Sequence, residues 1–194
     1  MAVAENNFKV YSIYFIVYLE LIYWGNIMFN TKTIVIGALL AAIAALFQSM
    51  PILLSEAFVF LTIFSAVPIY IVSRINPKTG VLSYFVASML VMLLSAHEGL
   101  FFLCTNGIVG ISLGICSYNK KMKAITWVLS ALVLTVTLSI MNYGIGIPVF
   151  GTKIPGAMII QIAIIFLFSI IYNIFYYYFS NYIFNNLKKF KIIE

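Results

Sequence analysis

The sequence predicts an all-α integral membrane protein: a bundle of six transmembrane helices with an extra helical segment at the N-terminus. Two observations predict this class. Hydrophobic residues make up 64% of the 194-residue chain and charged residues only 8%, whereas roughly a quarter of the residues in a soluble domain are charged. Apolar stretches near the length of about 20 residues that a spanning helix needs also recur along the chain. A water-soluble globule is therefore excluded.

The six predicted spans cover residues 34–50, 52–73, 80–96, 98–117, 123–142 and 156–186. Residues typical of turns separate them, among them Asn76-Pro77 and the Gly- and Pro-containing stretch 143–156. Pro68 lies inside the second span and is expected to kink it. The last span is longer than a bilayer requires, so we expect it to tilt or to extend beyond the surface. These spans define a membrane domain over 28–187, followed by a basic tail over 188–194.

Residues 1–27 form an N-terminal extension that has two interpretations. The segment 11–27 is a weaker span candidate, because it is short and contains Glu20. Alternatively, translation starts physiologically at Met28, and the extension is an artefact of an upstream start site. The extension lacks the basic start and the small-residue cleavage site of a cleaved signal peptide. The sequence leaves both interpretations open.

The positive charges predict the orientation of the bundle. Only Lys153 falls on one side of the six-span core, while the other side holds nine basic residues: Lys32, Arg74, Lys78, Lys120, Lys121, Lys123, Lys188, Lys189 and Lys191. Because cytoplasmic loops carry an excess of Lys and Arg, both ends of the core are expected to be cytoplasmic. The core's two acids, Glu56 and Glu98, then lie on the outer side.

The composition argues against several classes of function. The chain has one histidine, two cysteines and no aspartate, so we expect neither a metal site nor a cofactor. It also lacks the GxxxxGK[ST], HExxH and GxSxG motifs. Ion-coupled carriers usually place carboxylates near the middle of the membrane, where this core has none. A binding subunit that takes energy from a partner therefore fits better than an enzyme, and an acid–base pair of His97 and Glu98 is the least favoured alternative.

The fourth predicted span has one polar face. At about 100° per residue, this face holds Glu98, Phe102, Thr105 and Asn106. Gly107, Gly110 and Gly114 lie roughly opposite and favour close helix contact. Polar side chains are costly in lipid, so the polar face is expected to line the bundle interior or a water-filled cavity.

Further polar residues occur at the same outer level, and together they predict a small-molecule site. The candidate substrate-binding residues are Glu56, Glu98, Phe102, Asn106, Asn142 and Gln161. Two acids against one outer lysine favour a ligand with cationic or donor-rich groups. The alternative for each acid alone is contact with water or with Lys153 at the membrane interface.

Small residues form a stripe along the first predicted span. Gly37, Ala41 and Ala45 recur every four residues, with Ala38 and Ala42 beside them. Such stripes let helix backbones approach each other in lipid. The stripe is interpreted either as packing within the bundle or as a docking face for another membrane subunit.

Taken together, these features resemble the substrate-binding S components of energy-coupling factor (ECF) transporters. The resemblance covers about residues 28–186 and rests on the basic start Asn30-Thr31-Lys32, the Ala-rich first helix over 37–45, the six spans and the Gly-rich fourth helix. It implies a subunit of the bacterial cell membrane that captures a vitamin-like or other small micronutrient at the outer side.

The same resemblance implies the partners. These are a transmembrane coupling subunit and two cytoplasmic ATPases. The family's AxxxA motif would map to Ala38 and Ala42, or to Ala41 and Ala45, and would face the coupling subunit. The alternative is a non-transport membrane scaffold that assembles other proteins through the small-residue stripe and binds no small molecule.

Overall fold

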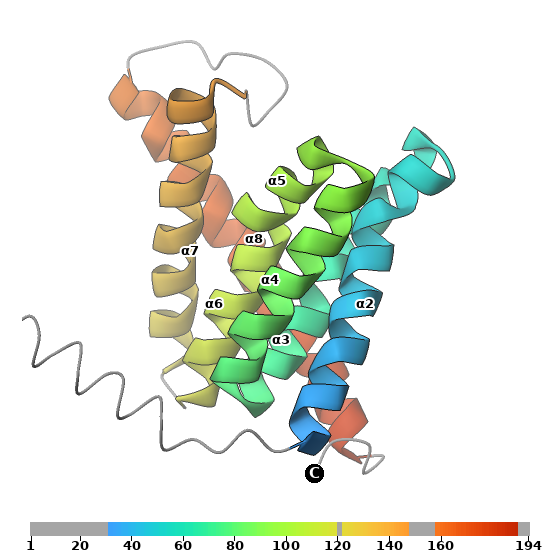
Figure 1. Ribbon diagram of the computed structural model, residues 1–194. Helices are drawn as coiled ribbons and strands as arrows, with labels where there is room; N and C mark the ends of the chain where they lie inside the picture. The colour runs from blue at the N-terminus through green and yellow to red at the C-terminus, as the bar shows by residue number, and fades with distance from the viewer. Residues whose placement is uncertain (1–30, 120–121, 148–157, 190–194) are drawn as a thin grey trace, which may run out of the picture. The chain divides into compact units, whose positions relative to one another are not determined.

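A computed structural model of the chain describes residues 31–119, 122–147 and 158–189, and the elements in these ranges are helices (Figure 1). Within these ranges, six helices are long and apolar enough to cross a membrane: Thr31–Leu53, Glu56–Ile75, Pro77–Leu94, Ala96–Tyr118, Lys123–Ile145 and Met158–Lys189. Each corresponds to one predicted span. The prediction of an all-α, multi-pass membrane protein with six spanning helices is thus confirmed, while the segment 11–27 and the Met28 start lie outside the described residues.

Three spans are continuous helices: α2 (Thr31–Leu53), α4 (Pro77–Leu94) and α8 (Met158–Lys189). Asn76 ends the preceding helix and caps α4, because its Oδ1 accepts from the backbone N–H groups of Lys78 and Thr79 at 3.0 and 3.4 Å. Pro77 follows in the first turn, where a missing N–H costs nothing. The break that the sequence marks at Asn76-Pro77 is therefore a capped helix start.

The other three spans change helix type along their length. The second consists of the 3-10 helix η1 (Glu56–Ser65) and α3 (Ala66–Ile75). The fourth is divided at Thr105 into α5 (Ala96–Cys104) and α6 (Asn106–Tyr118). The fifth consists of α7 (Lys123–Ser139) and the π-helical turn η2 (Ile140–Ile145).

Pro68, which was expected to kink the second span, lies in the first turn of α3. A proline is tolerated there, because the first N–H groups of an α-helix have no partner within the helix. The change from 3-10 to α geometry occurs just before it.

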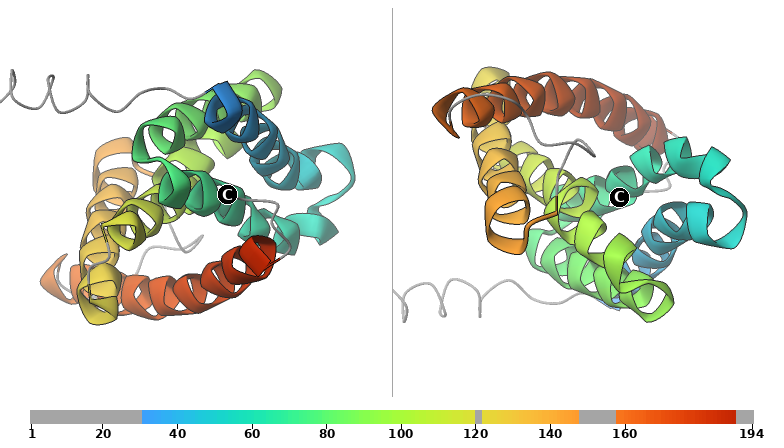
Figure 2. Two further views of the ribbon diagram at one scale, coloured as in Figure 1. Left: turned by 90° about the horizontal axis from the view of Figure 1, so that it is seen from below. Right: turned by 90° about the horizontal axis from the view of Figure 1, so that it is seen from above.

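Helices α3 and α6 lie in the interior of the bundle, with α2, α4, α7 and α8 around them (Figure 2). Two glycines of α6 permit its close contact with α3. A Cβ added at Gly110 would lie 2.5 Å from the Ala66 carbonyl oxygen, and one at Gly114 would lie 2.8 Å from the Tyr70 carbonyl oxygen. Two residues of the glycine face predicted for close helix contact thus pack on α3, whereas the third, Gly107, lies against Tyr84 of α4.

The outward side chains are large and apolar. Leu93, Ile159 and Ile171, on α4 and α8, are 83%, 82% and 70% exposed. A soluble monomer rarely exposes so much apolar surface, but lipid chains solvate it without penalty. The exposed surface is therefore the lipid-facing surface of a membrane bundle.

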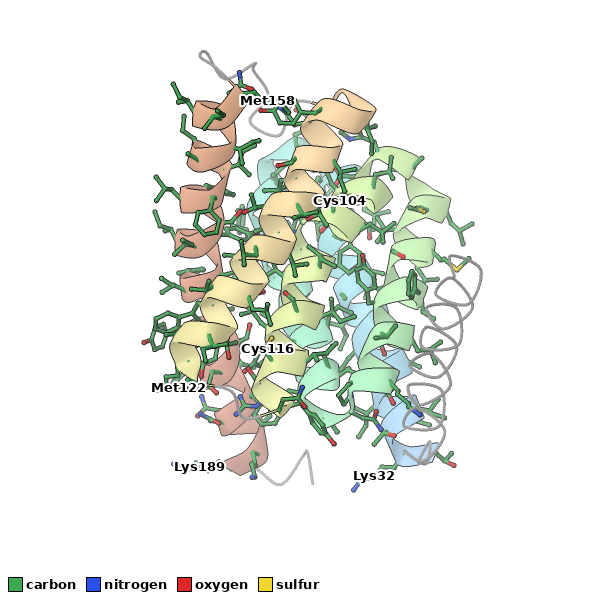
Figure 3. The ribbon with its side chains drawn as sticks, turned by 90° about the vertical axis from the view of Figure 1, so that its left-hand side faces the viewer. Lys32, Cys104, Cys116, Met122, Met158 and Lys189 are labelled. Atoms are coloured by element: carbon green, nitrogen blue, oxygen red, sulfur yellow. The ribbon has the colours of Figure 1, made fainter. Side chains whose placement is uncertain are left out.

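Charges of opposite sign lie at opposite ends of the bundle. Lys32 begins α2 and Lys189 ends α8, and Figure 3 shows both at the end away from Met158. Glu56 begins η1 and Glu98 lies in the first turn of α5, both at the other end. We call these the basic end and the acidic end.

Candidate functional site

A cavity of about 380 Å³ lies toward the acidic end, between α2, η1, α5, α6, α7 and α8. Its volume falls in the range of roughly 300–1,000 Å³ that is typical of small-molecule sites. The polar side chains that line it are Gln48, Thr62, His97, Glu98, Thr105, Asn106 and Tyr172. The remaining wall is apolar and includes Phe101, Leu134 and Phe168.

Asn106 is the hub of the hydrogen bonds in the cavity wall. It is only 6% exposed. Its Nδ2 donates to Gln48 Oε1 at 3.1 Å and to the Thr62 carbonyl at 2.9 Å, and its Oδ1 accepts from the Tyr172 hydroxyl at 2.7 Å. Both amide hydrogens of Asn106 are therefore used within the protein, and the residue connects α6 to α2, η1 and α8.

Gln48 continues this network toward the acid. Its Oε1 accepts from Asn106 and from the Ser65 hydroxyl at 3.0 Å, while its Nε2 donates to Glu98 Oε2 at 3.0 Å. Gln48 is buried, and Glu98 is half-buried at the cavity wall. The amide thus holds the carboxylate in place without neutralising its charge.

A second branch anchors η1. Tyr176 donates through its hydroxyl to the Ile63 carbonyl, and the Tyr172 hydroxyl lies 3.2 Å from that of Tyr176. The Ile63 carbonyl thus accepts from Tyr176, and the Thr62 carbonyl accepts from Asn106, so that two carbonyls near the end of η1 have side-chain partners. In lipid a backbone carbonyl without a partner costs several kcal/mol, so these buried side chains stabilise the helix against the bundle.

Irregular backbone borders the cavity on two sides. Runs of 3-10 helix longer than three or four residues are uncommon, yet η1 extends over ten residues and contributes Val59 and Thr62 to the wall. On the other side, the fourth span breaks at Thr105, which also lines the cavity. Non-helical or distorted backbone at membrane depth is tolerated where it is buried in protein or lines a cavity, and both conditions apply here.

The start of α5 suits an acidic side chain such as Glu98. Glu98 lies in the first turn of α5, whose cap is the Ser95 hydroxyl that accepts from the Glu98 backbone N–H at 3.4 Å. The positive end of a helix dipole favours a carboxylate there. Within the described ranges, no lysine, arginine or histidine forms an ion pair with it.

Aromatic rings complete the wall. The rings of Phe168 and Tyr172 stack with centroids 5.4 Å apart, and the His97 ring lies 4.7 Å from that of Phe101. Each of these four residues lines the cavity. The site therefore combines one carboxylate with several π faces.

The structure brings together two of the predicted substrate-binding residues, Glu98 and Asn106, and places the other four elsewhere. Glu56 is exposed at the start of η1 and outside the cavity wall. Asn142 is half-buried in η2, and Gln161 on α8 accepts from the Tyr143 hydroxyl at 2.5 Å.

Phe102 lies in the core instead of the cavity. It is 0% exposed and stacks against Tyr84 at 6.2 Å between ring centroids. The neighbouring residue, Phe101, lines the cavity together with Glu98. Phe101 follows Glu98 by three residues, whereas the predicted Phe102 follows it by four. Both spacings are compatible with one face of a helix, and only the position of α4 decides which ring turns inward.

Gln48, Thr62 and Tyr172 line the cavity but are not among the predicted substrate-binding residues. The sequence does contain a pattern that could have identified Gln48. It follows Ala45 by three residues and therefore lies on the same helix face as Ala41 and Ala45, which is buried. Thr62 and Tyr172 lie in apolar or aromatic runs that carry no comparable signal.

The small-residue stripe on α2 divides between two environments. Gly37, Ala41 and Ala45 are buried within the bundle, and the Ser83 hydroxyl of α4 donates to the Gly37 carbonyl at 3.0 Å. Ala38 and Ala42 are exposed. Packing thus accounts for one row of small residues, and the adjacent row faces outward.

Comparisons with protein-family models, with curated proteins and with solved structures give no match for this chain. Across the described residues, no group of three or more His, Cys, Asp or Glu side chains is arranged to hold a metal ion. The cavity can bind a small molecule through a carboxylate, hydroxyl oxygens and aromatic faces.

Proposed function

We propose that this chain is the substrate-binding S component of an ECF-type importer in a bacterial cell membrane. It captures a vitamin-like or other small micronutrient and docks on a coupling subunit that separate ATPases drive. The observation that carries the proposal is the cavity toward the acidic end, whose wall is held by a buried hydrogen-bond network. A wall of this kind is typical of a binding site, and a scaffold has no need of one.

The orientation follows from the basic end. A cytoplasmic basic end satisfies the bias of Lys and Arg toward cytoplasmic segments. The cavity then faces the outside, where an importer must capture its substrate. Both ends of the six-helix core are cytoplasmic in this arrangement.

The coupling subunit docks on the exposed row of α2, which contains Ala38 and Ala42. Small side chains on a lipid-facing helix allow a partner helix to approach closely. Ala41 and Ala45 are occupied by packing within the bundle, so the proposal assigns the AxxxA contact to the exposed pair. Transport requires the bundle to reorient against its partner, and an apolar surface on the exposed helices is compatible with such a movement.

Co-purification tests the docking. The full chain is expressed with the coupling subunit and the two ATPases of the same genome, and a tag on the chain is used to isolate the complex. Ala38→Leu with Ala42→Leu is expected to abolish recovery of the partners, because both added side chains obstruct the helix contact. Ala124→Leu with Ala163→Leu adds the same bulk at exposed alanines on α7 and α8, and should leave recovery unchanged.

Native mass spectrometry of the purified chain tests substrate capture. A retained small molecule together with the partner subunits supports the importer. Recovery of other membrane proteins, with neither ATPases nor a retained small molecule, would instead identify a scaffold and contradict the proposal.

A further inference from the structure

We infer that the cavity selects a small organic cation that carries N–H donors, such as a protonated amine, over neutral, anionic and fully alkylated molecules. This inference rests on the proposed function and names the substrate class of the same site. Three independent properties of the cavity wall support it: most of its hydrogen-bond donors are already engaged within the protein, its charge is negative, and it contains aromatic rings.

The donor hydrogens of the wall are largely used within the protein. The hydroxyls of Thr62 and Thr105 donate to the Val59 and Phe101 carbonyls of their own helical turns. Asn106 uses both amide hydrogens, and the Tyr172 hydroxyl uses its single hydrogen on Asn106.

The wall therefore offers a ligand mainly oxygen atoms that can accept hydrogen bonds. A hydroxyl that donates its hydrogen still has lone pairs, and an ionised carboxylate only accepts. Two side chains retain donors, because Gln48 uses one amide hydrogen on Glu98 and the His97 ring carries at least one N–H. A ligand rich in N–H groups therefore matches this wall better than a ligand rich in acceptors.

The charge of the wall is negative. Glu98 is the acid that lines the cavity, and among the residues that the structure describes neither lysine nor arginine lines it. The carboxylate accepts one side-chain hydrogen bond, from Gln48, among the residues that the structure describes. The sequence places two acids at this level, but Glu56 lies outside the cavity, so Glu98 is the one carboxylate in the described part of the cavity wall.

The aromatic rings favour the same ligand. Phe101, Phe168 and Tyr172 present rings to the cavity, and the face of an aromatic ring attracts a cation within about 6 Å. The cavity of about 380 Å³ holds roughly a dozen groups the size of a water molecule. The substrate is accordingly compact, with one cationic end against Glu98 and an apolar body against the rings.

Four probes that share a phenethyl body and differ in their head group separate the charge classes. Phenethylamine carries a cation with N–H donors, and trimethyl(phenethyl)ammonium carries the cation without them. Phenylethanol is neutral, and phenylpropionate is an anion. Binding of each to the full chain in lipid nanodiscs is measured by isothermal titration calorimetry and by the shift in Tm.

Phenethylamine is expected to bind most tightly, followed by the trimethylammonium probe. Glu98→Gln keeps the shape of the side chain and one oxygen that can accept from Gln48, but it removes the charge. Because a hydrogen bond to a charged group contributes about 1.5–3 kcal/mol, this change should weaken phenethylamine roughly 10- to 100-fold. Glu56→Gln is the matched control outside the cavity and should leave the affinity unchanged.

Three results would overturn the inference: binding of any of the other three probes as tight as that of phenethylamine, no detectable binding of phenethylamine, or an unchanged affinity in Glu98→Gln. A retained native molecule that is neutral or anionic also overturns it, yet leaves the importer proposal standing. If phenethylamine binds but the coupling subunit is not recovered, the inferred substrate class is supported and the importer proposal is contradicted.

Discussion

Replacing Asn106 with leucine removes the hub of the cavity wall at nearly constant volume. The change deletes three buried hydrogen bonds, to Gln48, to the Thr62 carbonyl and from Tyr172, at 2.7–3.1 Å. Side-chain hydrogen bonds within membrane proteins contribute about 0.6 kcal/mol each on average. We therefore expect the free energy of unfolding to fall by about 2 kcal/mol.

Alternative partners keep the loss near this value. The Tyr172 hydroxyl lies 3.2 Å from that of Tyr176 and can donate to it. The Ser65 hydroxyl lies within hydrogen-bond distance of both Gln48 Oε1 and the Thr62 carbonyl, at 3.0 and 2.6 Å, but its single hydrogen can satisfy only one of them. One buried acceptor is left without its partner, so the substitution is not silent.

Thermal unfolding of the full chain in nanodiscs measures the effect. For a domain of this size, 2 kcal/mol corresponds to a decrease in Tm of about 4–8 °C. Asn142→Leu is the matched control, because Asn142 is half-buried in η2 and outside the network. A Tm of Asn106→Leu equal to that of the wild type, or an equal loss in Asn142→Leu, would refute the assignment of Asn106 as the hub.

Three further substitutions test the packing around the site. Gly110→Ala should lower the free energy of unfolding by about 1–3 kcal/mol, because its Cβ would lie 2.5 Å from the Ala66 carbonyl oxygen. The control is Gly144→Ala, whose Cβ would lie 3.7 Å from its nearest neighbour and which should change this free energy by no more than about 0.5 kcal/mol. Equal melting temperatures of the two variants would contradict the close contact at Gly110. Asn173→Leu should destabilise less than Asn106→Leu. Asn173 donates one hydrogen bond, to the Ser169 carbonyl at 2.7 Å, and its buried Oδ1 has no hydrogen-bond partner among the described residues. A larger decrease in Tm would disprove this reasoning. Tyr176→Phe removes the hydroxyl that donates to the Ile63 carbonyl of η1. Amide hydrogen exchange over 56–65 should therefore accelerate, while the amides of α4 should keep their protection. Unchanged exchange over 56–65 would show that this hydrogen bond does not anchor η1.

The spans were predictable because lipid imposes a strong constraint on sequence. A segment that crosses the hydrocarbon core must be apolar over about 20 residues and must satisfy its own backbone, and only a helix does both within one segment. The break at Asn76-Pro77 and the glycine face of Gly110 and Gly114 follow from equally local rules. Each is found in the structure where the sequence places it.

The composition of the cavity was less predictable, because side chains of the same type occupy different environments. Glu56 and Glu98 both begin a helix at the acidic end, but only Glu98 meets the cavity. Phe101 and Phe102 are neighbours in sequence, and one lines the cavity while the other packs against Tyr84. These differences arise from packing between helices, because Phe102 packs against Tyr84 of α4 and Glu98 accepts a hydrogen bond from Gln48 of α2.

The sequence by itself determined that the core over 28–187 has six membrane-spanning segments, and it placed the basic residues and the two acids of this core on opposite sides. These properties depend on hydrophobicity and on the positions of charges along the chain, which are local. Tertiary structure decided that Gln48, Asn106 and Tyr172, from three different helices, form one network around Glu98. The physical reason is that a buried polar group must find a partner, and the partner is whichever group the packing brings within about 3 Å.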